Sequence, residues 1–339
     1  MKIDRLYGVV LALTLLQFFF WMHQFGPHIP AFYDYSVRIL NGHPDWRAVQ
    51  NRLLAPFILV RLFGWLPAPL PSFVLVFLAL CNYLFYRAAR EMIGAWGAAC
   101  ALAGYILLWL LLFCKVSQSC DLIEMSVLVL FWQWVMPRSD QRDQSFDVRL
   151  VGLFAIQLFN RESALFLPVY MGFCGALRLL WNNNPALGRR EMAWGVALFA
   201  VGIAVIETLR KTLFVMGPAA RAGADLKHKY FENFVIYRLN WMVARLDLHS
   251  HSFLEMVPIF LAMLILLYVV VIFTGILHKN PKLTAFGGTM TLYTTAIFIT
   301  AELNETRVMQ IIVPSAVLTL IWLLNGARKW IVARTAASG

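Results

Sequence analysis

The sequence predicts an all-α polytopic membrane protein, and three observations support this fold class. Of 339 residues, 60% are hydrophobic and only 14% are charged, and the mean hydropathy is +0.68. A water-soluble domain cannot bury so much apolar surface. Apolar stretches of the length that spans a bilayer core recur along the whole chain. The charged residues gather between these stretches. A single membrane domain over residues 1–339 is therefore expected.

About ten apolar stretches are the predicted transmembrane helices. They lie at roughly 6–25, 71–88, 93–113, 120–137, 149–159, 162–180, 192–214, 253–277, 284–301 and 307–326. Phe18-Phe19-Phe20-Trp21 ends the first stretch where a signal peptide would carry small residues, so we expect a retained helix. The fifth stretch is short and predicts a hairpin with the sixth.

Residues 26–70 do not fit a clean transmembrane helix. Their apolar part, Leu53 to Leu66, is interrupted by Pro56 and Arg61. Helices that alternate apolar and charged faces lie along a membrane surface instead of crossing it. We therefore expect amphipathic interfacial helices in this segment, and a second long loop at 215–252, both on the outer face.

The short basic loops predict the orientation. Lysine and arginine are enriched in short cytoplasmic loops. Such loops lie at 87–90, 137–149, 178–190 and 279–282 and in the C-terminal tail. With ten crossings, these loops and both termini are on the cytoplasmic side. The net charge of +11 fits this cytoplasmic bias and equally fits an outer cationic surface that attracts phosphates.

Acidic residues near the outer helix ends are the first candidate site residues. Asp34, in Phe32-Tyr33-Asp34-Tyr35, is either a turn or helix-cap residue or a general base near the membrane surface. Asp121 and Glu124 open the fourth stretch. The helix dipole alone explains Asp121. It explains Glu124 less well, because Glu124 lies one turn deeper on the same face. One of the two carboxylates either lines a cavity or is only a helix-end residue.

The same outer side carries cations and further acids. Charged groups close to lipid are costly and are therefore read as functional. Each also has a plainer explanation, as a salt bridge that reaches the surface or as a contact with anionic lipid headgroups. The residues are Arg161 and Glu162 at the hairpin tip, Arg210 and Lys211 at the end of the seventh stretch, and Glu302, Glu305 and Arg307 before the last.

The order of these features resembles the GT-C superfamily of integral-membrane glycosyltransferases, in its bacterial branch that uses polyprenyl-phosphate sugars. The resemblance covers roughly residues 1–325 as an arrangement. It is carried by Asp34 after the first helix, the stretch Asn51-Arg52-Leu53-Leu54-Ala55-Pro56, the helix end Tyr83-Leu84-Phe85-Tyr86-Arg87, Asp121, the hairpin tip Asn160-Arg161-Glu162-Ser163, and Glu305-Thr306-Arg307 with Pro314. Asp34 departs from the pattern, because it is not part of an Asp-Glu or Asp-Asp pair.

The resemblance implies a GT-C-like enzyme of the bacterial inner (plasma) membrane that transfers a sugar from a polyprenyl-phosphate donor on the periplasmic face. The acceptor would be a glycan, lipid or protein, and the only other partners would be membrane lipids. Asp34 would be the base and Asp121 the second catalytic acid. The donor phosphate or substrate would be bound by Arg52, Glu124, Arg161, Glu162, Arg210, Lys211 and Arg307, with Glu302 and Glu305 positioning them.

Several questions stay open at the level of sequence. Some superfamily members use a divalent cation such as Mg²⁺ or Mn²⁺, and no ligand set in this chain demands one. Nothing suggests a nucleic-acid partner, because no nucleotide or phosphate-loop motif is present. The alternative functions are a transporter or flippase of a lipid-linked or anionic solute, and a glycan polymerase or ligase that uses a lipid-linked oligosaccharide.

Overall fold

The computed structural model describes residues 6–43, 52–111, 119–136, 148–212, 257–300 and 307–338, and within these ranges the protein is helical with no strand. The elements in chain order are α1 (Leu6–Phe25), η1 (Gly26–His28), α2 (Ile29–Leu40), α3 (Leu54–Phe57), η3 (Ile58–Leu62), α4 (Pro69–Leu111), α5 (Ser119–Val135), α6 (Val148–Asn160), η4 (Glu162–Leu165), α7 (Phe166–Leu180), α8 (Pro185–Thr212), α11 (Val257–Leu277), α12 (Pro281–Thr300) and α13 (Arg307–Ser338).

The predicted second and third stretches are the two arms of α4. The backbone of Gly94 has φ 75° and ψ 175°, which lies outside the helical region and bends the element. Such a backbone favours glycine, because a side chain is strained there. The rings of Phe85 and Tyr105 stack 5.0 Å apart across the bend, so the two arms fold back on one another. A single glycine thus turns one long helix into a hairpin.

The chain is built as a multi-pass membrane protein. Six stretches of the described residues are helices long and apolar enough to cross a bilayer. A helix was found at each of the ten predicted stretches, but the number that cross stays a prediction. Helix α6, with 13 residues, rises about 20 Å, less than the hydrocarbon core of about 30 Å.

Two helices begin earlier than predicted, and asparagine explains both cases. The predicted starts were 192 and 284, whereas α8 begins at Pro185 and α12 at Pro281. Asn184 Oδ1 accepts a hydrogen bond from Leu187 N at 3.2 Å. Asn280 Oδ1 accepts one from Leu283 N at 3.1 Å. An asparagine cap followed by proline is a typical helix start, so the predicted 178–190 loop is only a tight turn.

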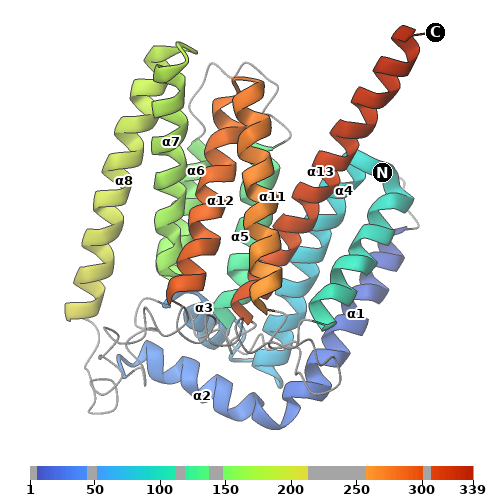
Figure 1. The fold of residues 1–339 in the computed structure, drawn as a ribbon. Helices are drawn as coiled ribbons and strands as arrows, with labels where there is room; N and C mark the ends of the chain where they lie inside the picture. Colours follow the sequence, from blue (N-terminus) through green and yellow to red (C-terminus); the bar gives the residue numbers. More distant parts are fainter. Residues whose placement is uncertain are drawn as a thin grey trace, which may run out of the picture.

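Helix α2 lies across one end of the helix bundle (Figure 1). The chain turns there through η1, and Ile39 of α2 is buried against Tyr35, Leu53 and Leu209. After α2 the chain returns to the bundle through the short elements α3 and η3, where Ala55 and Leu59 are fully buried. Whether the 26–70 segment lies at the membrane interface stays a prediction. The predicted loop 215–252 lies outside the described residues.

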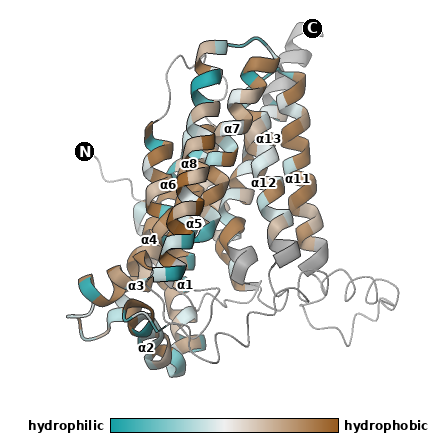
Figure 2. Ribbon diagram, turned by 90° about the vertical axis from the view of Figure 1, so that its left-hand side faces the viewer, coloured by the Kyte–Doolittle hydropathy of each residue, from teal (hydrophilic) through white to brown (hydrophobic). Residues whose placement is uncertain are grey.

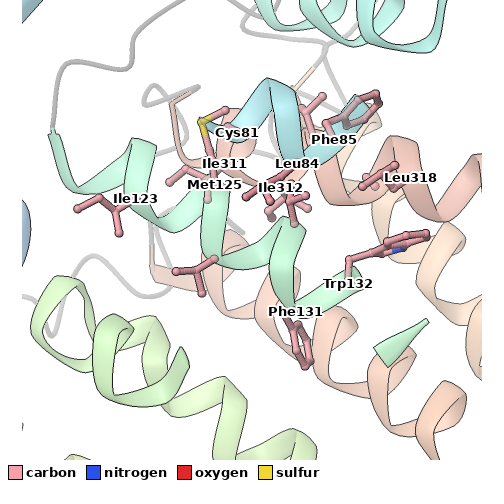
Figure 3. Close-up of a cluster of buried hydrophobic side chains, with 14 of the residues drawn as sticks. Cys81, Leu84, Phe85, Ile123, Met125, Phe131, Trp132, Ile311, Ile312 and Leu318 are labelled. Carbon is pink, nitrogen blue, oxygen red and sulfur yellow. The ribbon is translucent and has the colours of Figure 1, made fainter. Parts of the chain in front are cut away.

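Helix α5 runs through the middle of the core. Its Met125, Phe131 and Trp132 are at most 2% exposed. Met125 and Trp132 lie among side chains of α4 and α13 such as Phe85 and Ile312 (Figure 3), and Phe131 packs against rings of α7 and α12. Outward-facing residues of α8 and α11 are instead large, apolar and exposed, and α11 is apolar along its length in Figure 2. This is the surface expected beside lipid. The first turn of α5 therefore brings its charges into a fully enclosed position.

Candidate functional site

One guanidinium joins two carboxylates at the end of the bundle where α2 lies. Arg161 Nη1 is 2.9 Å from Asp121 Oδ1 and 2.7 Å from Glu124 Oε2. The side chains of Asp121 and Glu124 are 0% and 1% exposed, and that of Arg161 is 15% exposed. Three of the predicted site residues therefore form one buried ionic cluster.

Local backbone structure explains why these three groups meet. Asp121 and Glu124 are three residues apart in the first turns of α5, so they share a helix face. Helix α6 ends at Asn160, and Arg161 then has an extended backbone with φ −165° and ψ 153° before the turn η4. Asn160 Nδ2 donates to the carbonyl of Cys120 at 3.0 Å and ties the two helix ends together.

Glu124 is surrounded by hydrogen-bond donors. Besides Arg161, it accepts a hydrogen bond from Ser163 Oγ and one from Tyr293 Oη at 2.8 Å. The ring of Phe166 lies edge-on to Tyr293 with centroids 4.9 Å apart and holds it in place. Glu124 thus connects α5, η4 and α12, which are far apart in the sequence.

The sequence analysis did not identify Tyr293 or the role of Ser163. Ser163 follows two predicted site residues, so its position was a usable signal. Tyr293 lies within an apolar helix, and a buried tyrosine hydroxyl normally needs a polar partner. This rule predicts that Tyr293 has a polar partner but not which residue it is, since Glu124 lies 169 positions away in the chain.

Charge keeps Arg161 protonated in this cluster. Burial by itself lowers the pKa of the guanidinium, but the carboxylates of Glu124 and Asp121 hold that pKa well above its ordinary value. A single guanidinium therefore serves two buried carboxyl groups. The contacts favour a positioning role for Arg161, because its guanidinium is already engaged by protein carboxylates.

Arg52 is the second buried cation of this region. It is 8% exposed, and its Nε and Nη1 atoms have no hydrogen-bond partner among the described residues. Its neighbour Leu53 donates a backbone hydrogen bond to Phe159 O at 2.9 Å, which places the start of α3 against the end of α6. The thiol of Cys120 lies close enough to feel the charge of Arg52.

Asp34 is in a different environment from Asp121. It lies on α2 and pairs with Arg38, whose Nε is 3.1 Å from Asp34 Oδ2. The side chain of Asp34 is 64% exposed. No described contact joins Asp34 to the buried cluster, although both lie at the same end of the bundle (Figure 1). Asp34 is thus the accessible acid and Asp121 the enclosed one.

The remaining predicted site residues are not brought into the cluster by a described contact. Glu162 is half-buried in η4, and Lys211 is exposed at the end of α8. The side chains of Arg210 and Arg307 fall outside the described part of the structure, as do Glu302 and Glu305 entirely. Within the described ranges, no three His, Cys, Asp or Glu side chains come together in a way that would hold a metal ion.

Comparisons of this chain with protein-family models, with curated proteins and with solved structures found no match. Its function must therefore be argued from the arrangement of its own residues. This arrangement can accept a proton at the exposed Asp34, and it offers an enclosed guanidinium at Arg52. The ionic cluster of Asp121, Glu124 and Arg161 connects the start of α5 to the end of α6.

Proposed function

We propose that this chain is a GT-C-like membrane glycosyltransferase that moves a sugar from a polyprenyl-phosphate donor to an outward-facing acceptor of the cell envelope. The observation that carries the proposal is the gathering of ionisable residues at one end of an apolar bundle. An amphipathic helix with an exposed carboxylate lies there across an enclosed cluster of charges. A lipid-linked donor presents its phosphate at such a boundary between lipid and water.

The proposed reaction assigns a separate task to each group. The acceptor hydroxyl attacks the anomeric carbon while Asp34 takes its proton. The bond between the anomeric carbon and the phosphate oxygen breaks, and the polyprenyl phosphate leaves with the electron pair. A cation near the leaving oxygen stabilises the developing charge. Asp121 is enclosed and ion-paired, so we assign it the task of holding Arg161 instead of exchanging protons with substrate.

The direct test is sugar transfer by purified protein in lipid. We would supply a panel of radiolabelled polyprenyl-phosphate sugars together with a crude envelope fraction as acceptor. We expect label to move into the acceptor with the wild-type protein. We expect Asp34→Asn to lower the rate by about 10²- to 10⁴-fold, the usual contribution of a general base.

The matched control is Glu91→Gln. Glu91 also belongs to an exposed pair one helical turn apart, with Arg87 at 3.9 Å, and its side chain is likewise 64% exposed. It lies beside the Gly94 bend of α4, away from α2 (Figure 1), so this variant should transfer at the wild-type rate. Wild-type transfer by Asp34→Asn would remove Asp34 as the base. No transfer from any donor by folded protein would favour transport, or a polymerase that needs a longer donor.

A further inference from the structure

The buried guanidinium of Arg52 has no protein partner for two of its nitrogen atoms. Nε and Nη1 each carry a hydrogen-bond donor, are inaccessible to solvent, and find no acceptor in the described part of the chain. No described carboxylate lies within ion-pair distance of Arg52. An enclosed charge with unfilled donors destabilises the protein unless something binds it.

A complementary unfilled group lies close by. Asp121 Oδ2 is also buried and without a hydrogen-bond partner among the described residues, because Arg161 engages only Oδ1. Arg52 lies just before α3, which packs against α5, and Asp121 lies in the first turn of α5. The two groups have opposite charge, yet no ion pair joins them among the described residues. A ligand between them would satisfy both.

At the end of the bundle where α2 lies, other described cations are paired or exposed, so Arg52 is the candidate for binding an anion. Arg161 is occupied by two carboxylates, Arg38 is paired with Asp34, and Lys211 is exposed. Arginine binds oxyanions through charge-assisted hydrogen bonds, and Nε and Nη1 are the donors of Arg52 that such an oxyanion could fill. A hydroxyl of the same ligand would donate to Asp121 Oδ2.

We infer that Arg52 is the anion-binding residue of a buried site for a phosphate-type oxyanion, formed where α3, the start of α5 and the end of α6 meet. The inference rests on the proposed function only for the source of the ligand, since a polyprenyl-phosphate donor would supply such a group. A free phosphate has the same chemistry.

The test measures binding and does not depend on transfer. Purified protein in detergent is titrated with inorganic phosphate, with farnesyl phosphate and with farnesol, and heat release is recorded. We expect both phosphates to bind the wild-type protein and farnesol to bind far more weakly than farnesyl phosphate. Tighter binding of farnesyl phosphate than of inorganic phosphate would identify a lipid-linked ligand, and equal binding a free one.

Three variants decide the role of Arg52. Arg52→Gln should weaken phosphate binding by about 10- to 100-fold, the range of a charge-assisted hydrogen bond. Arg52→Lys keeps the positive charge but lacks the Nε and Nη1 donors, so its loss of phosphate affinity should be intermediate. Arg61→Gln removes an exposed cation of the adjacent element η3 and should bind as the wild type does.

The inference is overturned if phosphate does not bind the wild-type protein, if Arg52→Gln binds normally, or if Arg61→Gln loses as much affinity. Thermal unfolding without ligand checks that each variant is folded. Should Arg52→Gln fail to fold, Arg52→Lys decides the question by the same comparison. Phosphate binding without sugar transfer would support the site and contradict the proposed function. Wild-type transfer by Arg52→Lys and Arg52→Gln, together with lost phosphate binding, would support the proposed function and show that Arg52 binds a free phosphate instead of the donor.

Discussion

At the scale of single residues, the contribution of an ion pair to stability depends on whether the pair is exposed to solvent or buried. Asp34 and Arg38 form a pair that remains open to solvent, where an ion pair contributes about 0–1 kcal/mol. Asp121 and Glu124 lie in the interior and depend on Arg161. There the loss of one partner leaves a buried charge uncompensated. Loss of the cation should therefore cost little stability at the exposed Asp34 pair and much more at the buried cluster of Asp121 and Glu124.

Replacement of Arg161 should show this dependence. We expect Arg161→Met to lower the free energy of unfolding by about 3–5 kcal/mol, because two enclosed carboxylates lose their only described cation. Arg38→Met should cost at most about 1 kcal/mol. Adding Asp121→Asn and Glu124→Gln to Arg161→Met should recover much of the loss. Denaturant titration in detergent measures all of these, and wild-type stability of Arg161→Met alone would contradict the expectation.

At the scale of secondary-structure elements, glycine sets the distance between neighbouring helices. A Cβ added at Gly175 of α7 would come within 2.5 Å of Gly188 O and 2.6 Å of Met192 N in α8. A Cβ at Gly195 of α8 would likewise come within 2.6 Å of the Gly172 amide nitrogen. Small residues allow this close approach, which is a common basis of helix association in membranes. Because α7 follows η4 directly, its position also affects the ionic cluster.

The substitution Gly175→Ala tests this contact. We expect it to destabilise the protein by about 1–3 kcal/mol, because the two backbones must separate to admit a methyl group. Gly172→Ala in the same helix is the control, since an added Cβ there meets nothing within 4 Å. The midpoint of thermal unfolding compares the two variants. Equal midpoints for both would show that α7 and α8 do not depend on close backbone contact.

At the scale of the whole molecule, the two ends of the bundle differ in kind. One end carries α2, the ionic cluster and Arg52. The turn between α7 and α8 lies at the other end, and α13 also ends away from α2 (Figure 1). The predicted topology places α2 on the outer face and the short basic turns in the cytoplasm. The side of the membrane that each end faces is a separate question for experiment.

Labelling of single cysteines answers that question. In a background without the native cysteines, we expect Arg38→Cys to react with a membrane-impermeant maleimide in intact cells. Asn183→Cys, in the exposed turn between α7 and α8, should react only after the membrane is permeabilised. The opposite pattern would invert the predicted orientation, and labelling of both residues in intact cells would contradict a bundle that spans the membrane.

Much of the element order could be predicted from the sequence. Helix-length apolar stretches, the broken segment around Pro56 and the acids at the start of α5 are all local signals. The boundaries of α8 and α12 were predicted too late in the chain, although the Asn184-Pro185 and Asn280-Pro281 pairs were present as helix-start signals. Hydropathy does not mark these two starts, because a helix-capping asparagine is polar.

The helical membrane class and the concentration of charge near a few helix ends follow from local patterns in the chain, because hydropathy and capping depend on neighbouring residues. Which charges meet depends on tertiary structure. Glu124, Arg161 and Tyr293 converge from three distant segments, and Asp34 stays outside while Asp121 is enclosed. Pairing and burial depend on packing between helices, and packing brings together residues that no local pattern in the chain connects.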